Sequence, residues 1–249
     1  MTSLYSMVQN YRMILSYDGT DFHGWQRQLN KRTVQDTIEK ALFKITKNKV
    51  AVIGAGRTDK GVHALAQVAN FKTTLILKEE EFTRALNSTL PNDIRVISME
   101  KVALDFHARE MALSKVYQYR IFNSPLITPF LMRYVLHWSA PLDLEKMKKA
   151  AELFIREDDF SGFSSNRFLN PVRRVTESKV EKRGDEIIYT IEANGFLRYM
   201  ARTIVGTLLE IGRGKAEPEI IEEIFRKKER HLAGPTAPAR GLCLIKVKY

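Results

Sequence analysis

The sequence is poor in the residues that build disulfide frameworks and metal centres. Its one cysteine, Cys243, lies in an apolar terminal run, so we expect a small core side chain and no disulfide framework. The five histidines are scattered, with no His-x-His or His-x-x-x-His pair. This spacing lacks the ligand pattern of a zinc or iron site. We therefore expect no metal and no thiol chemistry.

Long hydrophobic runs are also missing. The most apolar stretch, residues 203–211, is short and contains Glu210, whereas a membrane-spanning helix needs about 20 apolar residues. Residues 1–12 lack the apolar core of a secretory signal and the Arg- and Ser-rich pattern of a transit peptide. We expect a cytoplasmic protein with no membrane span.

Acidic residues are too few to balance the basic ones. Among 249 residues, 40 are Lys or Arg and 29 are Asp or Glu, which gives a formal net charge of +11. A surplus of positive charge of this size favours a polyanionic partner, and nucleic acid is the first candidate. The chain is 44% hydrophobic and 28% charged, which is a globular composition and excludes a disordered or fibrous protein.

Hydrophobic periodicity in the first half predicts the element order βαββαβ. Thr33 suits the N-cap of the first helix, because apolar residues at three-to-four spacing follow it, and Pro91 ends the second helix. The expected strands are residues 11–17, 50–54, 62–71 and 94–102, and the expected helices are residues 34–45 and 79–90.

The second half repeats this order without repeating the sequence. The expected strands are residues 113–122, 173–181, 186–193 and 242–249, and the expected helices are residues 142–156, 196–212 and 218–230. We predict an α+β protein with two ferredoxin-like halves, residues 1–105 and 106–249. The halves are expected to form a mixed, mainly antiparallel sheet, with helices on one face and a cleft between them. Sheets of this type often bind RNA on an open face.

The densest polar segment, residues 54–64, lies between two predicted strands. Asp59 is its one acid and stands among Arg57 and Lys60. One interpretation is a solvated turn in which Asp59 caps local amides. The other is a carboxylate that stays ionised beside an RNA backbone and acts as a nucleophile, while Arg57 and Lys60 contact phosphate or fill the base stack. The glycine spacing fits neither the dinucleotide fingerprint nor the Walker A motif.

Residues 56–64, Gly-Arg-Thr-Asp-Lys-Gly-Val-His-Ala, resemble the signature of the tRNA pseudouridine synthase A family. The resemblance continues in the expected order through residues 17–28, 85–87, 90–91, 93–96, 115–119, 159–161, 171–173, 195–214 and 233–238. It implies an isomerase that converts uridine to pseudouridine at positions 38 to 40 of the tRNA anticodon stem-loop. It also implies a homodimer that needs no cofactor and no metal.

The resemblance assigns three central roles. Asp59 is the catalytic carboxylate, attacking C1′ or C6 of the nucleoside, and Arg202 is the cation that pairs with it and favours its charged form. Tyr117 stacks on the target base after that base has been flipped out. Without the resemblance, Tyr117 is a strand core residue and Arg202 is a solvated helix arginine. The general base is not assigned.

Further residues are expected to bind the RNA. Arg57 resembles the residue that fills the gap left by the flipped nucleotide, and its alternative role is a phosphate contact, as for Lys60. Gln26 and Arg27 belong to a loop, residues 22–28, that contacts RNA or shapes the cleft.

The chain departs from the family pattern at three positions. Glu110 stands where an aromatic residue is usual, Met111 where a small polar residue is common, and Thr203 where asparagine usually follows the arginine. These departures bear on the preference among the three uridines. The alternative function is a catalytically silent RNA-binding or RNA-folding protein on the same scaffold. The combination of a carboxylate, a stacking aromatic and a cation argues against it.

Overall fold

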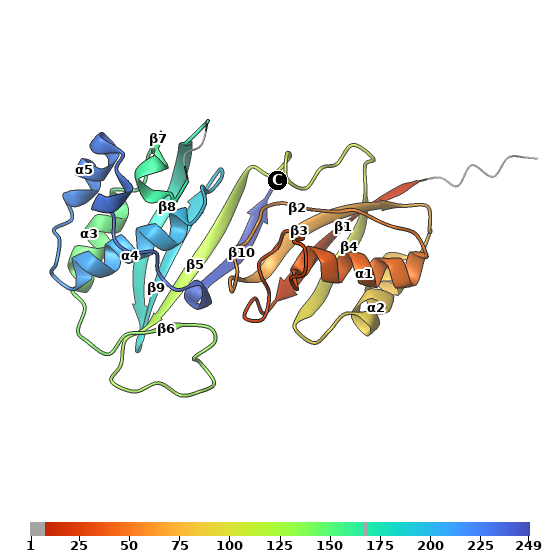
Figure 1. The fold of residues 1–249 in the computed structure, drawn as a ribbon, viewed down its shortest axis with the longest axis horizontal. Helices are drawn as coiled ribbons and strands as arrows, with labels where there is room; N and C mark the ends of the chain where they lie inside the picture. Colours follow the sequence, from red (N-terminus) through yellow and green to blue (C-terminus); the bar gives the residue numbers. More distant parts are fainter. Residues whose placement is uncertain (1–7, 167–168) are drawn as a thin grey trace, which may run out of the picture. The chain divides into compact units, whose positions relative to one another are not determined.

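The computed structural model describes residues 8–166 and 169–249, which divide into two compact units (Figure 1). The first unit runs to Leu113 and includes Leu244–Tyr249, and the second is Ser114–Cys243. Both units combine helices with mainly antiparallel strands. The predicted α+β class is therefore confirmed.

The first unit has the predicted βαββαβ order. Its elements are β1 (Gln9–Tyr17), α1 (Val34–Thr46), β2 (Val52–Gly54), β3 (His63–Thr73), α2 (Glu79–Thr89) and β4 (Ile94–Val102). The strands are hydrogen-bonded in the order β4-β1-β3, and both β2 and the terminal strand β10 (Leu242–Lys248) pair with β3. Helices α1 and α2 pack against each other, as Figure 1 shows. The long strand β3 is thus the centre of this unit.

Helix α1 forms because its first turn is capped and one of its faces is apolar. The Thr33 hydroxyl accepts a hydrogen bond from the Asp36 N–H at 3.4 Å, as the sequence predicted for this N-cap. Val34, Ile38 and Leu42, at helical spacing, are fully buried. The burial of this face fixes the helix against the sheet.

The second unit contains the remaining elements. They are β5 (Ser114–Phe122), β6 (Leu136–His137), α3 (Leu144–Glu152), β7 (Glu157–Asp159), β8 (Val172–Arg183), β9 (Glu186–Ala193), α4 (Met200–Gly212), α5 (Ile220–Lys227) and three short 3-10 helices, Phe160–Phe163, Arg230–Leu232 and Ala239–Gly241. Strands β5, β9, β8 and β7 are hydrogen-bonded in that order and antiparallel, while β6 pairs in parallel with β5. The β8–β9 hairpin turns at Gly184, whose φ is 59°.

Helix α4 begins four residues later than the sequence predicted. Tyr199 has φ 64° and ψ 3°, a left-handed conformation that a right-handed helix cannot contain. The helix therefore starts at Met200, and Phe196 belongs to the connection that precedes it. The two-residue β6 and three-residue β7 were not predicted, since strands this short show no hydrophobic period.

Helix α4 is pressed against the segment 233–237. A Cβ added to Gly206 would lie 1.7 Å from the carbonyl oxygen of Pro235. The Gly234 N–H donates to the Thr207 hydroxyl at 3.0 Å, and the Ala237 N–H donates to the Arg202 carbonyl at 3.0 Å. Only a glycine at position 206 permits this approach, which ties the segment to the first two turns of α4.

We predict that Gly206→Ala destabilises the protein. Glycine to alanine inside a helix normally stabilises it by about 1 kcal/mol, but here the new Cβ meets backbone, so a loss of about 2 kcal/mol or more is expected in the free energy of unfolding in urea. Gly212→Ala is the control, because the nearest atom, the Met147 Sδ at 2.7 Å, belongs to a flexible side chain. Equal stability of the two variants would contradict this packing.

Candidate functional site

Asp59 lies in the loop between β2 and β3, and a second loop, residues 18–25, holds that loop in place. The Trp25 N–H donates to the Thr58 carbonyl at 3.0 Å, and the Gly61 N–H donates to the Phe22 carbonyl at 3.2 Å. These bonds lie on either side of Asp59. The backbone that carries the carboxylate is therefore fixed by its neighbour loop.

Two glycines allow the two loops to meet backbone to backbone. A Cβ on Gly24 would lie 2.6 Å from the Thr58 carbonyl oxygen, and the φ of Gly24 is +86°. A Cβ on Gly19 would lie 2.0 Å from the Val62 carbonyl oxygen. Larger residues would push the Asp59 loop outward, so both glycines are part of the geometry of the site.

Buried side chains also anchor these two loops. The Thr58 side chain is 6% exposed, and its hydroxyl lies 2.8 Å from the Tyr17 hydroxyl. The His63 ring is also buried, with its Nδ1 3.0 Å from the backbone nitrogen of Gly19 and 3.2 Å from an Asp18 carboxylate oxygen. His63 is therefore a structural anchor. Asp59 itself is half-buried.

Positive charge surrounds the Asp59 loop. The Arg57 and Lys60 side chains are exposed. Burial, together with the charges of Lys60 and Lys31, lowers the pKa of His23 below its ordinary value. The buried Nδ1 of His23 has no hydrogen-bond partner within the described part of the chain. The neutral form of His23 is therefore favoured.

Tyr117 lies on β5 of the second unit and is 6% exposed. Its ring packs edge-on against the Phe196 ring, with centroids 5.0 Å apart and planes at 81°. Tyr119, two residues further along the strand, has its side chain on the same face of the sheet. The Tyr119 hydroxyl donates to the Pro238 carbonyl at 2.8 Å. Tyr117 and Tyr119 therefore contact the connection that precedes α4 and the segment that contains Pro238, respectively.

Arg202 lies in the first turn of α4 and is half-buried. Its Nε donates to the Ala237 carbonyl at 2.7 Å, and its guanidinium carbon is 4.9 Å from the centre of the Tyr199 ring. Burial raises the pKa of Tyr119, and the charges of Arg202 and Arg240 oppose that rise. Arg202 is therefore an anchored cation on the face that carries Tyr117 and Tyr119, unlike a solvated helix arginine.

The structure distributes the predicted residues between the two units. Asp59 lies in the first unit, together with Arg57, Lys60, Gln26 and Arg27, and the last two follow the loop that holds the Asp59 loop. The second unit contains the other two predicted residues, Tyr117 and Arg202.

Gln26 and Arg27 are engaged with α1. The Gln26 side-chain amide donates to the Gln35 side-chain oxygen at 2.8 Å, and the Arg27 N–H donates to the same oxygen at 3.0 Å. The Arg27 guanidinium pairs with Glu39 at 2.8 Å, although its side chain remains 63% exposed. Gln26 thus fixes the loop, while Arg27 can still meet a ligand.

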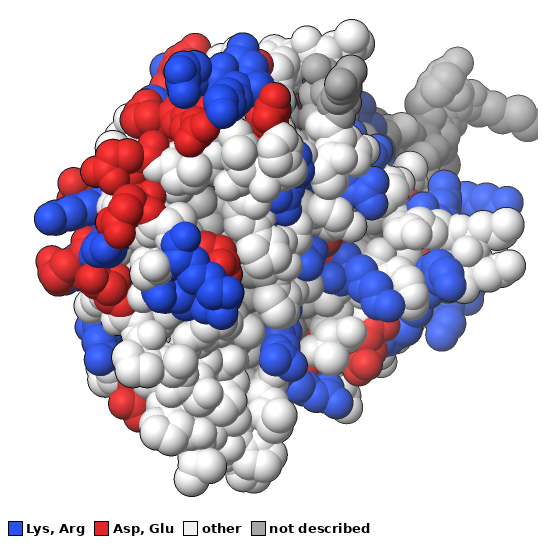
Figure 2. All heavy atoms as spheres, turned by 60° about the vertical axis from the view of Figure 1, so that its left-hand side comes forward, with Lys and Arg blue, Asp and Glu red and all other residues white. Residues whose placement is uncertain are grey.

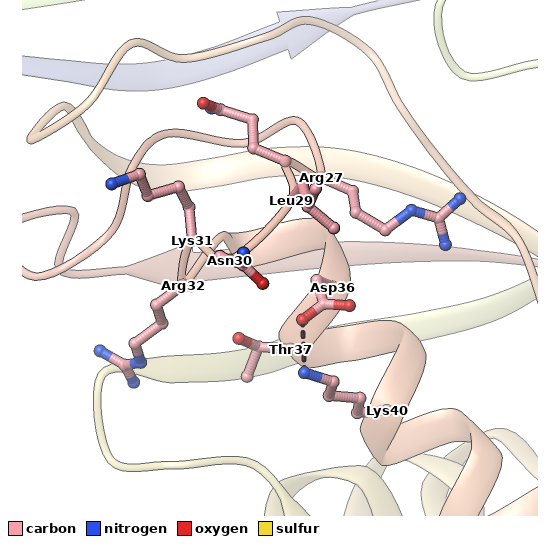
Figure 3. Close-up of a pocket in the computed structure, with 9 residues that line it drawn as sticks. Arg27, Leu29, Asn30, Lys31, Arg32, Asp36, Thr37 and Lys40 are labelled. Carbon is pink, nitrogen blue, oxygen red and sulfur yellow. Dashed lines mark ion pairs between the residues drawn. The ribbon is translucent and has the colours of Figure 1, made fainter.

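A basic hollow of about 810 Å³ lies beside this loop (Figure 3). Its lining consists of Arg27, Gln28, Leu29, Asn30, Lys31, Arg32, Asp36, Thr37 and Lys40. Lys40 meets Asp36 at 2.7 Å in the view of Figure 3, and Arg32 pairs with Asp93 at 2.7 Å. Lys31 makes no ion pair with any residue that the structure describes. Most of the positive charge in the hollow is therefore compensated.

The basic runs of α3 and α5 are compensated as well. Figure 2 turns this side of the second unit forward and shows acidic and basic side chains intermixed. The ion pairs are Lys146–Glu217 at 2.7 Å, Lys148–Glu145 at 2.8 Å, Lys227–Glu223 at 2.6 Å and Lys228–Asp159 at 3.1 Å. Lys146, Lys148, Lys227 and Lys228 are therefore each paired with an acidic side chain.

Sequence reasoning missed Gly24 and Tyr199. The signal for Tyr199 was its place three residues before Arg202, but its left-handed backbone has no sequence signature. Gly24 contacts Thr58, a residue far along the chain, so local pattern does not indicate its role. In residues 8–166 and 169–249, no helix is long and apolar enough to cross a membrane. The same residues contain no group of three or more His, Cys, Asp and Glu side chains suited to a metal ion.

Comparison with the sequences of known proteins identifies the family of this chain. The sequence profile of the tRNA pseudouridine synthase family matches residues 13–109 and 150–249. The chain is 45% identical to tRNA pseudouridine synthase A of Acetivibrio thermocellus and 46% identical to that of Thermoanaerobacter sp. strain X514, in each case over 97% of this chain and 100% of the relative. It is also 46% identical to that of Caldicellulosiruptor saccharolyticus, with the same coverage. The chain belongs to the tRNA pseudouridine synthase family, whose members are isomerases.

Proposed function

We propose that the protein isomerises uridine to pseudouridine at positions 38 to 40 of the tRNA anticodon stem-loop, with Asp59 as the nucleophile. The observation that carries this proposal is the Asp59 loop. Its one acid is flanked by exposed cations and is held by backbone contacts that glycine alone permits. A carboxylate next to a polyanion is unfavourable for binding alone. A catalytic role for the carboxylate explains its presence at that position.

The proposed reaction is balanced without a co-reactant. Asp59 attacks C1′ or C6, the N1–C1′ bond breaks, and the base rotates. The C5–C1′ bond then forms, and the bond between Asp59 and the nucleoside breaks, which releases the carboxylate. The proton on C5 is lost, and N1 gains a proton. Uridine and pseudouridine have the same composition, so no oxidant, reductant or group donor takes part. The enzyme must supply a nucleophile, hold the detached ring and exclude water.

The other residues take supporting roles in this proposal. Arg202 pairs with Asp59 and keeps it ionised, and Tyr117 stacks on the flipped base. Arg57 fills the gap that the base leaves, while Lys60 and Arg27 contact the RNA backbone. Gln26 acts through the loop that it pins to α1. We propose that the enzyme works in the cytoplasm as a homodimer.

We predict that Asp59→Ala abolishes turnover while tRNA binding is kept. Loss of the nucleophile should lower kcat by about 10⁴-fold or more, whereas removal of an acid does not weaken phosphate contacts. The assay measures tritium released from C5-labelled uridine in unmodified tRNA, with no methyl donor, and binding is measured at the same salt concentration. Asp105→Ala, at an exposed acid of the same unit, is the control.

Each outcome of this assay decides between the two functions. Release by the wild type and by Asp105→Ala, with no release by Asp59→Ala, supports an isomerase that acts through Asp59. Normal release by Asp59→Ala would refute the assigned nucleophile. Tight tRNA binding without release by any form would favour the silent RNA-binding protein.

We predict that Arg57→Lys lowers kcat about tenfold with little change in KM, because a lysine lacks the planar guanidinium that replaces a base in the stack. A phosphate contact would behave differently, since lysine keeps the charge. Arg84→Lys, at an exposed arginine of α2, is the control. An unchanged kcat in Arg57→Lys would assign Arg57 to phosphate.

We predict that Gly24→Ala lowers kcat because the new Cβ moves the Thr58 carbonyl and so displaces Asp59. Gly214→Ala is a matched control, since its φ is +71° but no atom lies within 4 Å of an added Cβ. Both variants should lose about 1 kcal/mol of unfolding free energy through backbone strain, and Gly24→Ala should lose more because its Cβ meets the Thr58 carbonyl. Turnover should fall only in Gly24→Ala, and a similar kcat for both would contradict the positioning role.

A further inference from the structure

Tyr199 has a backbone conformation that helix capping does not explain. Among the described residues, four outside glycine have positive φ: Asn30, Lys47, Tyr199 and Lys228. Lys47 and Lys228 are C-caps, where left-handed residues are usual. Tyr199 is instead an N-cap with φ 64°, a position that normally has extended backbone, and its side chain makes no capping hydrogen bond. The strain must be sustained by other contacts.

The Tyr199 ring makes two contacts with charged side chains, in addition to the backbone hydrogen bonds of the turn. The guanidinium carbons of Arg198 and Arg202 each lie 4.9 Å from the ring centroid of Tyr199, within the range of a cation–π interaction. Arg198 Nη2 also lies 3.3 Å from the Tyr199 hydroxyl oxygen. The left-handed turn thus places one aromatic ring against two cations at the start of α4.

The ring and one carbonyl together define the orientation of Arg202. The Arg202 Nε donates to the Ala237 carbonyl at 2.7 Å, and the Ala237 N–H donates back to the Arg202 carbonyl at 3.0 Å. The segment that carries Ala237 is locked against α4 at Gly206. Arg202 is thus held both by the hydrogen bond to Ala237 and by the Tyr199 ring.

We propose that Tyr199 is a positioning residue that orients the Arg202 guanidinium for its carboxylate partner. This inference rests on the proposed function, in which that partner is Asp59. The left-handed backbone at Tyr199 is retained because it holds the ring against the guanidinium, in keeping with strain stored at functional sites. The effect of Tyr199 is therefore on kcat, since the geometry of the ion pair matters during chemistry and contributes little to tRNA affinity.

Three substitutions separate the ring from the backbone. Tyr199→Phe keeps the aromatic face, and Tyr199→Leu keeps bulk and backbone strain but removes that face. Tyr199→Asn removes the ring and suits a left-handed backbone. We expect Tyr199→Phe to keep kcat within about twofold, whereas the leucine and asparagine variants lose about tenfold in kcat with KM within about threefold. The thermal midpoint of Tyr199→Asn should equal or exceed that of the wild type, because strain is relieved.

Three outcomes would overturn the proposal: a wild-type kcat in Tyr199→Leu, a wild-type kcat in Tyr199→Asn, or equal losses in all three variants. The last result would assign the role to the hydroxyl group. If the asparagine variant fails to fold, the phenylalanine and leucine variants still decide, because both keep the same backbone strain and similar bulk.

A measurement independent of activity distinguishes this inference from the proposed function. In protein with ¹⁵N-labelled arginine, the Arg202 Nε–H resonance, assigned by its loss in Arg202→Lys, should exchange slowly with water in the wild type and in Tyr199→Phe. Faster exchange is expected in the leucine and asparagine variants. Unchanged exchange would refute the positioning role even if the enzyme is active. Altered exchange in a protein without isomerase activity would support the contact and refute the proposed function.

Discussion

The candidate site depends on close backbone-to-backbone contact, which each unit achieves with glycine. In the first unit, Gly24 lies against the Thr58 carbonyl, and this contact fixes the loop that carries Asp59. In the second unit, Gly206 lies against the Pro235 carbonyl, and this contact fixes the segment whose Ala237 carbonyl holds Arg202. Backbone contacts deform less than contacts between long side chains. Polar groups in loops can therefore be positioned as firmly as groups on regular elements.

Electrostatics follows from this geometry. The net charge of +11 is spread over the chain, but on α3 and α5 ion pairs balance it. In the loops of the first unit, the pKa of His23 is lowered by burial and by Lys60 and Lys31, so a second positive group is disfavoured there. The exposed Arg57 and Lys60 side chains attract a polyanion to the same loops.

Local patterns predicted most of the fold and part of the site. Strand β4 has the predicted bounds, and α1 begins directly after Thr33, as predicted. Both were predictable because hydrophobic periodicity and helix capping are encoded within a few residues. The Asp59 loop was identified by its motif and its charge. Side-chain contacts between elements were not predictable: the sequence placed Gln26 in a loop that contacts RNA or shapes the cleft, and it did not show that the Gln26 amide binds Gln35 on α1. The N-terminal boundary of α4 was wrong because tertiary contacts fix the conformation of Tyr199.

The departure at Tyr199 indicates where local preference and function conflict. Asparagine or glycine would adopt this left-handed conformation at lower cost than tyrosine. A residue that is locally unfavourable persists only when its contacts offset the strain, and here those contacts are two arginine side chains. One of them is the arginine that the resemblance assigns to the catalytic carboxylate. The local conformational preference therefore fails beside a charged side chain, and such departures from an otherwise consistent sequence are the positions at which a functional role is sought.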